Sequence, residues 1–170
     1  MWDCSWICSR GRSVRDCRTA SSTDAGFFRK LQRQRSAAMK RQYTDEHAAA
    51  GVNARLPEIE TWPNQFSTGY EIEIIMPEFT SVCPKTGLPD SGIMTLRYVP
   101  DKLCLELKSL KMYTLAYRNL GIFQENAVNR MLADIVKAAH PHSATLVGAF
   151  APRGGVTTKI TANWSRKRAR

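Results

Sequence analysis

Apolar residues between Phe123 and Ala139 recur at intervals of three and four, and the run stops before Pro141. This spacing puts them on one face of an α-helix, and that face has to be buried against another apolar surface. The segments before and after the run follow a different period, since their apolar residues alternate with polar ones as in half-buried strands. The sequence therefore predicts a helix that packs on a sheet built from its flanking segments.

Four strands and one further helix are expected around that helix. The strands span 71–75, 93–99, 145–151 and 156–164, with a turn at 152–155 between the last two. The further helix spans 106–119, which contains no Gly or Pro, and should end at Gly121. Runs of strands and runs of helices that alternate in this way predict an α+β fold, an antiparallel four-stranded sheet with both helices on one face. The open face and the sheet edges need cover, which suggests oligomerisation.

The formal net charge of +10 is concentrated at the two ends of the chain. Residues 1–38 hold eight Lys or Arg against three Asp, and residues 166–170 hold four basic residues. Residues 39–165 keep thirteen basic and twelve acidic residues, so their net charge is only +1. Because this part is nearly neutral, nucleic acid is not expected as a partner. We therefore divide the chain into a leader (1–38), one globular domain (39–165) and a basic tail (166–170).

The leader is rich in Arg and Ser and shows neither a helical nor an alternating period. Three explanations are open: a transit-like peptide, a disordered tail, or translation from a start upstream of the true one at Met39, which we favour. The leader contains Cys4, Cys8 and Cys17, but no histidine or further cysteine pair completes a metal site, and no disulfide framework is expected. No run is apolar enough to span a membrane, so a cytoplasmic protein is expected.

A thiol and a carboxylate stand at the two ends of the segment CPKTGLPD, at Cys83 and Asp90. Pro84, Gly87 and Pro89 interrupt the strand pattern and predict a tight return of the chain, so that the two side chains can share one pocket. The alternative is a small buried cysteine near a solvated turn aspartate, and the spacing taken alone favours that alternative.

Four segments together resemble one family, the short 7-cyano-7-deazaguanine reductases, which are nitrile reductases of queuosine biosynthesis. The segments are PEFTSVCPKTGLPD (77–90), ELKSLKMY (106–113), FQENAVN (123–129) and PRGG (152–155). The resemblance covers 56–164 and implies a tunnelling fold, in which subunits form stacked rings with active sites at subunit boundaries. It also implies that NADPH delivers two hydrides in succession to the nitrile of a deazaguanine substrate and gives an aminomethyl group for tRNA modification.

The resemblance implies a catalytic pair. Cys83 adds to the nitrile carbon as a thiolate and forms a covalent thioimide, which accepts hydride more readily than a nitrile does. Asp90 donates a proton to the nitrogen. A free thiol, with a pKa of about 8.5, needs help to ionise near neutrality. An ordinary aspartate needs desolvation or a nearby negative charge to keep its proton, so we expect one of these at Asp90.

The resemblance also implies the binding residues. Glu125 accepts two N–H bonds from the guanine-like edge of the substrate, and Glu106 and Leu107 help to bind it. The phosphates of NADPH are bound by Lys108, Ser109, Lys111 and Arg153. Without the resemblance, the lysine pair is an ordinary solvated helix face and Glu125 is an acidic residue favoured at a helix N-terminus.

Two positions depart from the family pattern. Gln124 stands where many members have a histidine, so a proton relay is not expected there, since an amide does not titrate. Ser91 follows Asp90 where an aromatic residue is common, which predicts looser packing around Asp90.

Three alternative functions remain in view. The first is a relative of the same fold that forms an amidine from a nitrile with Cys and Asp but without NADPH; ELKSLKMY argues against it. A zinc-dependent pterin cyclohydrolase would need a set of Cys and His zinc ligands, and the scattered Cys and His residues of 39–165 do not provide such a set. A non-catalytic RNA-binding protein would use the basic ends of the chain.

Overall fold

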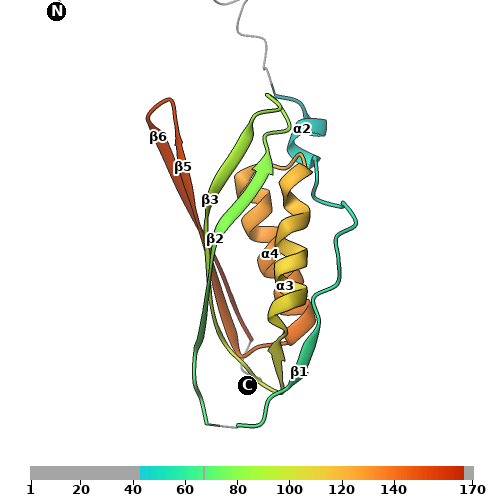
Figure 1. Cartoon of the computed structure of the whole chain (residues 1–170), viewed down its shortest axis with the longest axis vertical. Coiled ribbons are helices and arrows are strands. Elements are labelled where there is room, and N and C mark those ends of the chain that lie inside the picture. The colour runs from blue at the N-terminus through green and yellow to red at the C-terminus, as the bar shows by residue number, and fades with distance from the viewer. Residues whose placement is uncertain (1–42, 67, 167–170) are drawn as a thin grey trace, which may run out of the picture. The chain divides into compact units, whose positions relative to one another are not determined.

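The computed structural model describes residues 43–66 and 68–166. Its main sheet contains β2 (Ile72–Val82), β3 (Pro89–Val99), β5 (Ser143–Arg153) and β6 (Val156–Ser165), in the spatial order β2-β3-β5-β6 with every neighbouring pair antiparallel. The helices α3 (Leu107–Leu115) and α4 (Gln124–Ala139) lie side by side on the same face of this sheet (Figure 1). The predicted α+β arrangement, with four antiparallel strands and two helices on one face, is confirmed.

The first two strands are longer than the sequence pattern predicted. β2 continues through Pro77 to Val82, whereas the alternation alone supported 71–75. The β2–β3 register shifts between Met76 and Phe79, so a bulge lies where Pro77 cannot donate a backbone hydrogen bond. β3 then begins at Pro89, which shortens the connecting loop to 83–88.

Three short elements were not predicted. They are α2 (Asp45–Ala49), β1 (Thr61–Pro63) and β4 (Leu103–Leu105). β1 and β4 pair antiparallel in a separate two-stranded sheet. Segments this short contain less than two periods of any pattern, so periodicity cannot reveal them. The predicted helix 106–119 is present, but its last residues, Ala116–Asn119, form a 3₁₀ helix.

The hydrophobic core lies between the helices and one face of the sheet. Along β3, Met94, Leu96 and Tyr98 are buried and alternate with outward side chains. A Cβ atom added at Gly148 in β5 would lie only 2.6 Å from Cγ2 of Val128, so this glycine lets α4 pack directly on the sheet. The predicted apolar face of α4 is the buried one, and its core residues are Ala127, Val128, Met131, Leu132, Ile135 and Ala139.

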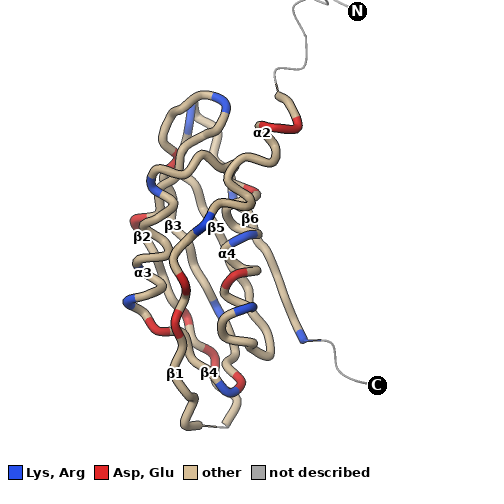
Figure 2. The backbone as a smooth tube through the Cα atoms, turned by 90° about the vertical axis from the view of Figure 1, so that its right-hand side faces the viewer, with Lys and Arg blue, Asp and Glu red and all other residues tan. Residues whose placement is uncertain are grey.

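The other face of the sheet is not covered by a helix anywhere in the described part of the chain (Figure 1). Ile75 and Ile93 keep 58% and 46% of their surface exposed. Lys and Arg are interspersed with Asp and Glu along the described body, in keeping with its nearly neutral charge (Figure 2). No helix within 43–66 or 68–166 is both long enough and apolar enough to cross a membrane.

The proposed leader and the end of the proposed tail, residues 167–170, lie outside the described residues. Arg166, the first residue of that tail, is described and is attached to the fold. Its backbone N–H donates to the carbonyl of His142 at 3.0 Å, and its guanidinium donates to Asp101 at 2.8 Å.

Candidate active site

The β2–β3 hairpin buries a thiol and a carboxylate at one end of the fold. Cys83 follows β2 and is 8% exposed, and Asp90 is the second residue of β3 and is 4% exposed. The backbone N–H of Cys83 donates to the carbonyl of Leu88 at 2.9 Å, and the N–H of Gly87 donates back to the Cys83 carbonyl at 2.9 Å. Gly87 has φ +68°, which favours glycine, and it lets the loop close this tightly.

The loop between the strands changes the acidity of the thiol. Burial raises the pKa of Cys83, but hydrogen bonds from the hydroxyl of Thr86 and from backbone groups of Thr86 and Lys85, together with the charge of Arg153, outweigh that effect. The pKa of Cys83 therefore lies below its ordinary value. Donors and a cation around the sulfur are the environment in which a cysteine becomes a nucleophile.

Asp90 is held from two other parts of the fold. Gln124, the first residue of α4, donates from Nε2 to Oδ1 of Asp90 at 2.8 Å. Arg153, the last residue of β5, donates from Nη2 to the same oxygen and forms an ion pair. The hydroxyl of Thr158 in β6 donates to Oε1 of Gln124 and so fixes which way the amide faces. Since both donors to Asp90 contact Oδ1, neither engages Oδ2.

A short backbone pairing brings α4 to this place. Val82 and Gly121 form a parallel bridge, in which the Val82 N–H donates to the Leu120 carbonyl at 3.0 Å and the Ile122 N–H donates to the Val82 carbonyl at 2.9 Å. α4 begins two residues later, so its N-terminus stands beside the end of β2. Glu125 is in the first turn of α4, next to Gln124, and its side chain is exposed.

The turn between β5 and β6 sets the position of Arg153. Gly154 and Gly155 have φ +57° and +83°, the two positive values that a two-residue hairpin turn requires. Arg153 pairs with Val156 across the turn and its side chain reaches back to Asp90. The structure thus places this arginine beside the carboxylate; the sequence predicted it as a phosphate-binding residue.

The other predicted binding residues gather at the N-terminus of α3. Glu106 caps this helix, since its carboxylate accepts from the N–H groups of Lys108 at 2.8 Å and Ser109 at 2.6 Å. These two backbone bonds lower the pKa of Glu106. The Ser109 hydroxyl accepts from the N–H of Glu60 at 2.9 Å. Leu107, Lys108 and Lys111 are exposed.

The predicted residues therefore form two groups. We call Cys83, Asp90, Gln124, Glu125 and Arg153 the hairpin site, and Glu106, Leu107, Lys108, Ser109 and Lys111 the helix site. α3 and the 3₁₀ helix after it connect the two and run along the length of the body (Figure 1). At about 1.5 Å per α-helical residue and about 2.0 Å per 3₁₀ residue, they separate the two sites by roughly 20 Å.

Sequence reasoning missed several contacts at the hairpin site. Gln124 was expected to be able to hydrogen-bond but not to titrate, and the sequence did not reveal its partner, which is Asp90. Thr158 carried no signal, because its contact depends on how β6 lies next to α4. The looser packing expected from Ser91 does not expose the carboxylate: Asp90 is buried, and the exposed Ser91 alternates to the other face of the strand.

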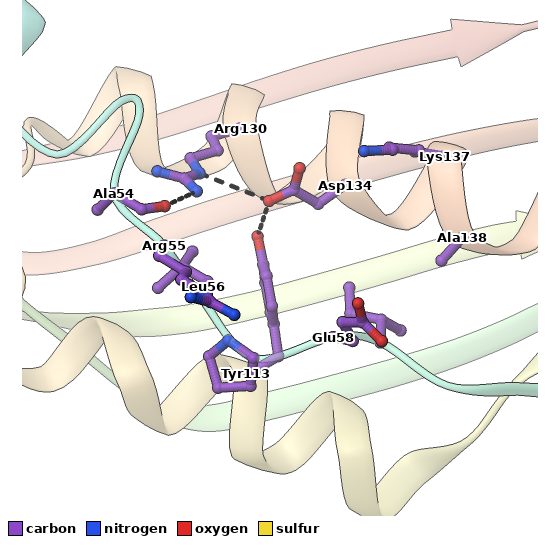
Figure 3. A pocket seen from close by; sticks show the side chains of 11 residues that line it. Ala54, Arg55, Leu56, Glu58, Tyr113, Arg130, Asp134, Lys137 and Ala138 are labelled. Atoms are coloured by element: carbon purple, nitrogen blue, oxygen red, sulfur yellow. Dashed lines mark hydrogen bonds and ion pairs between the residues drawn. The ribbon is translucent and has the colours of Figure 1, made fainter.

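A separate cavity of about 420 Å³, lined by none of the residues of the two sites, lies between residues 54–59 and the two helices (Figure 3). Tyr113, the last residue of ELKSLKMY, is 1% exposed and donates to Oδ2 of Asp134 at 2.6 Å. Arg130 also contacts Asp134 and donates to the carbonyls of Gly51 and Ala54. Through these bonds, residues 51–54 are held against α4, and α4 is held against α3. Tyr113 therefore has a structural role within ELKSLKMY.

Fold and site together define a class, an α+β protein with a buried thiol of lowered pKa and a buried carboxylate at the end of a hairpin. Among solved structures, the chain is similar to the archaeosine synthase QueF-Like in the apo form, with a TM-score of 0.51 and 20% identity over 58% of this chain and 95% of that chain. At this identity the likeness shows the fold alone, and it confirms the tunnelling fold predicted for the single chain, that is, its arrangement of strands and helices.

Comparison of sequences finds relatives with higher identity to this chain than the solved structure has. The family model for QueF-like protein matches residues 89–169. The NADPH-dependent 7-cyano-7-deazaguanine reductase of Elusimicrobium minutum (strain Pei191) is 57% identical over 74% of this chain and 95% of its own length. The enzyme of that name from Chloroherpeton thalassium (strain ATCC 35110 / GB-78) is 54% identical over 66% of this chain and 98% of its own length. The chain belongs to the family of NADPH-dependent 7-cyano-7-deazaguanine reductases.

Proposed function

We propose that this chain reduces the nitrile of 7-cyano-7-deazaguanine in queuosine synthesis through a covalent thioimide on Cys83. Membership of the family makes it an NADPH-dependent oxidoreductase acting on that substrate. The observation that carries the covalent step is a thiol 8% exposed whose pKa is nevertheless lowered by the loop around it. An inert buried cysteine in apolar surroundings would have its pKa raised.

In the first step, the sulfur of Cys83 adds to the nitrile carbon and one π bond of the nitrile is replaced by a C–S bond. The nitrogen gains one proton, which is the proton that the thiol gives up, so the step needs no other reactant. Asp90 is the group proposed to pass this proton on. Gln124 and Arg153 fix its Oδ1, which directs Oδ2 toward a substrate held beside Cys83.

Bound NADPH would supply two hydrides, which together with two protons turn the thioimide carbon into an aminomethyl group; the C–S bond breaks on the way and Cys83 is returned as a free thiol. The residues of the helix site fit the phosphates of such a cofactor, because Lys108 and Lys111 present exposed ammonium groups. The Glu106 carboxylate already occupies the N–H groups of Lys108 and Ser109. Phosphate recognition is therefore assigned to the two ammonium groups, and Glu106 and Leu107 act by shaping this end of the helix. Arg153 remains a third cation for the cofactor if it leaves Asp90.

Glu125 is the proposed reader of the guanine-like edge. It follows Gln124 at the start of α4, its carboxylate is exposed, and a carboxylate can accept two parallel N–H bonds from an aminopyrimidinone. The N-terminus of α4 thus offers a neutral amide to Asp90 and a carboxylate to the substrate within two successive residues.

We infer that a second copy of the chain completes each active site. The helix site lies roughly 20 Å from Cys83 along the helical segment of the same chain. The uncovered face with Ile75 and Ile93 and the edge strands β2 and β6 offer surfaces for assembly. These features support the predicted stacked rings with active sites between subunits.

The proposed division into a leader (1–38), a catalytic domain (39–165) and a basic tail (166–170) is a prediction that protein sequencing of the native chain would test.

The decisive experiment follows NADPH absorbance when the nitrile is added to the purified protein. We expect oxidation of about two NADPH per amine formed. Without NADPH, mass spectrometry should find an adduct of the substrate on Cys83, and Asp90→Asn should slow its formation about 100-fold. Absence of any nitrile-dependent NADPH oxidation would reject the reductase, and an amidine product would instead favour the relative that works without NADPH.

A mixing experiment tests whether two copies share a site. Cys83→Ala lacks the nucleophile and the double variant Lys108→Ala/Lys111→Ala lacks the cofactor cations, so each is expected to be nearly inactive alone. Mixed after dissociation and reassembly, they should regain activity, because some boundaries then combine an intact hairpin site with an intact helix site. If the mixture stays as inactive as its components, each site is built within one chain.

A further inference from the structure

One buried hydroxyl at the hairpin site has no partner. Ser81 is in β2, two residues before Cys83, and is 0% exposed. Its Oγ has no hydrogen-bond partner among the described residues. An unpaired buried hydroxyl costs about 1–3 kcal/mol, so such a group calls for a partner that a functional state supplies.

The register of the hairpin puts this hydroxyl next to the carboxylate. Ser81 is directly opposite Asp90 in the β2–β3 pair. Both side chains are buried, and directly opposed residues on one face of a sheet have Cβ atoms about 4.5–5.5 Å apart. Alternation along β2 puts Ser81 on the same face as Cys83. Ser81 therefore lies next to Asp90 and on the same face as Cys83, the two residues that are proposed to do the chemistry.

A second unpaired atom marks the same place. Nε of Arg153 is also buried without a hydrogen-bond partner among the described residues, although Nη2 of this side chain contacts Asp90. Two unpaired polar atoms thus flank one carboxylate, of which only Oδ1 is engaged by Gln124 and Arg153. The pattern is that of a site whose hydrogen bonds are completed when substrate is present.

We propose that Ser81 is a positioning residue of this reaction: its hydroxyl donates to Oδ2 of Asp90, directly or through one water molecule, and holds the carboxyl toward the nitrile nitrogen. The hydroxyl has three staggered positions about the single Cα–Cβ bond, and Asp90 is the residue directly opposite it in the strand pair. Ser81 acts through Asp90 and forms no bond to the substrate. The inference rests on the proposed function, because it assigns Ser81 a task in thioimide formation.

The test measures the rate of adduct formation on Cys83 at saturating nitrile, without NADPH. Ser81→Ala removes only the hydroxyl, and we expect the rate constant to fall about tenfold, the effect of losing one hydrogen bond to a charged group. The nitrile concentration for half-maximal rate should not change, because Ser81 does not bind the substrate. Ser91→Ala is the matched control, since it is the same substitution next to Asp90 but on the exposed face, and it should leave the rate unchanged.

A double-mutant cycle separates positioning from direct contact. In an Asp90→Asn background, Ser81→Ala should have no further effect on the rate, because the group it positions is already disabled. Ser81→Thr keeps a hydroxyl and should restore most of the lost rate. Melting temperatures of all variants confirm that the fold is retained.

The possible results are distinct. A wild-type protein that forms no adduct defeats the proposed function itself. A wild-type protein that forms the adduct, together with a Ser81→Ala variant that does so equally fast, defeats the positioning role, and the hydroxyl is then only an unpaired buried group. An undiminished effect of Ser81→Ala in the Asp90→Asn background also overturns it, because Ser81 would then act on the substrate directly.

Discussion

The hairpin site and the helix site differ in how far their polar side chains are exposed to solvent. At the hairpin site, Cys83 and Asp90 are buried, and their polar atoms are held by the loop, by α4 and by β5. At the helix site, Lys108 and Lys111 are exposed to solvent. The carboxylate of Glu106 accepts hydrogen bonds from backbone N–H groups of the helix that it caps.

The contrast in burial fits the two tasks that the proposed function assigns to these sites. Bond formation at a nitrile requires a nucleophile and a proton carrier that are desolvated and fixed, and burial with several partners achieves both. A charged cofactor requires accessible cations that can be reached from outside. In the proposed reaction the hairpin site and the helix site of one chain therefore have separate tasks, and variants of each site test that division.

The largest effect should come from the nucleophile. Cys83→Ala is expected to lower nitrile-dependent NADPH oxidation by about 1,000-fold or more and to abolish the covalent adduct, because no other group in the hairpin site can form the C–S bond. Steady-state kinetics and mass spectrometry check this. Cys104→Ala is the control, since Cys104 is the other described cysteine, is buried in β4, and should be dispensable for activity. Retention of the adduct in Cys83→Ala would contradict the assignment.

The next effect separates the two sites. Lys108→Ala and Lys111→Ala should each raise the KM for NADPH about tenfold, the loss of one charge-assisted contact, while adduct formation without NADPH keeps its rate. Lys137→Ala, an exposed lysine on α4, should change neither quantity. If the lysine variants also slow the adduct, the helix site takes part in the chemistry and the division between the two sites is wrong.

A smaller effect concerns the acidity of the thiol. Thr86→Val removes the side-chain hydrogen bond that helps to lower the pKa of Cys83, so that pKa should rise. Alkylation of Cys83 measured against pH should then show its inflection at higher pH than in the wild type, with about threefold slower alkylation near neutrality. Thr80→Val, a half-buried threonine earlier in β2, serves as control. An unchanged inflection in Thr86→Val would mean that the backbone donors and Arg153 suffice.

The smallest effect is one of stability at the helix site. Glu106→Gln should lower the melting temperature slightly, because the amide is a weaker acceptor for the N–H groups of Lys108 and Ser109. The pKa of Glu106 is lowered in the folded chain. The carboxylate therefore contributes fully to the stability of the fold above its unfolded pKa of about 4.5, and this stability is lost as the pH falls through the lower pKa of the folded chain. The difference between variant and wild type should therefore shrink at acid pH. Thermal unfolding between pH 3 and pH 7, about the range in which a carboxyl titrates, checks this, and a pH-independent difference would contradict it.

Much of the fold could be predicted because its signals are local. The three- and four-residue spacing in α4 and the alternation in β3 are set by near neighbours in the sequence, and each pattern is compatible with one backbone geometry. The loop with Pro84, Gly87 and Pro89 likewise predicted a return of the chain between Cys83 and Asp90, and the structure has the hairpin there. The resemblance of four segments then supplied roles that periodicity cannot give.

Other features depended on residues that are far apart in the sequence. Gln124 meets Asp90 because Val82 pairs with Gly121, and Arg153 reaches the same carboxylate because a turn of two glycines ends β5 at the right register. Ser81 is opposite Asp90 only because the bulge at Met76 and Phe79 shifts the register of the strands. The separation of the hairpin site from the helix site follows from the direction in which α3 crosses the sheet.

The sequence by itself thus determined the order of the four long strands and of the helices α3 and α4, and the buried face of α4, because each is encoded over a few neighbouring positions; the resemblance added a proposal for the residues that do the chemistry. The tertiary structure alone decided which of those residues meet. Strand register, helix placement and side-chain burial arise from packing the whole chain, and they set Cys83 and Asp90 at one end of the body and Lys108 and Lys111 at the other.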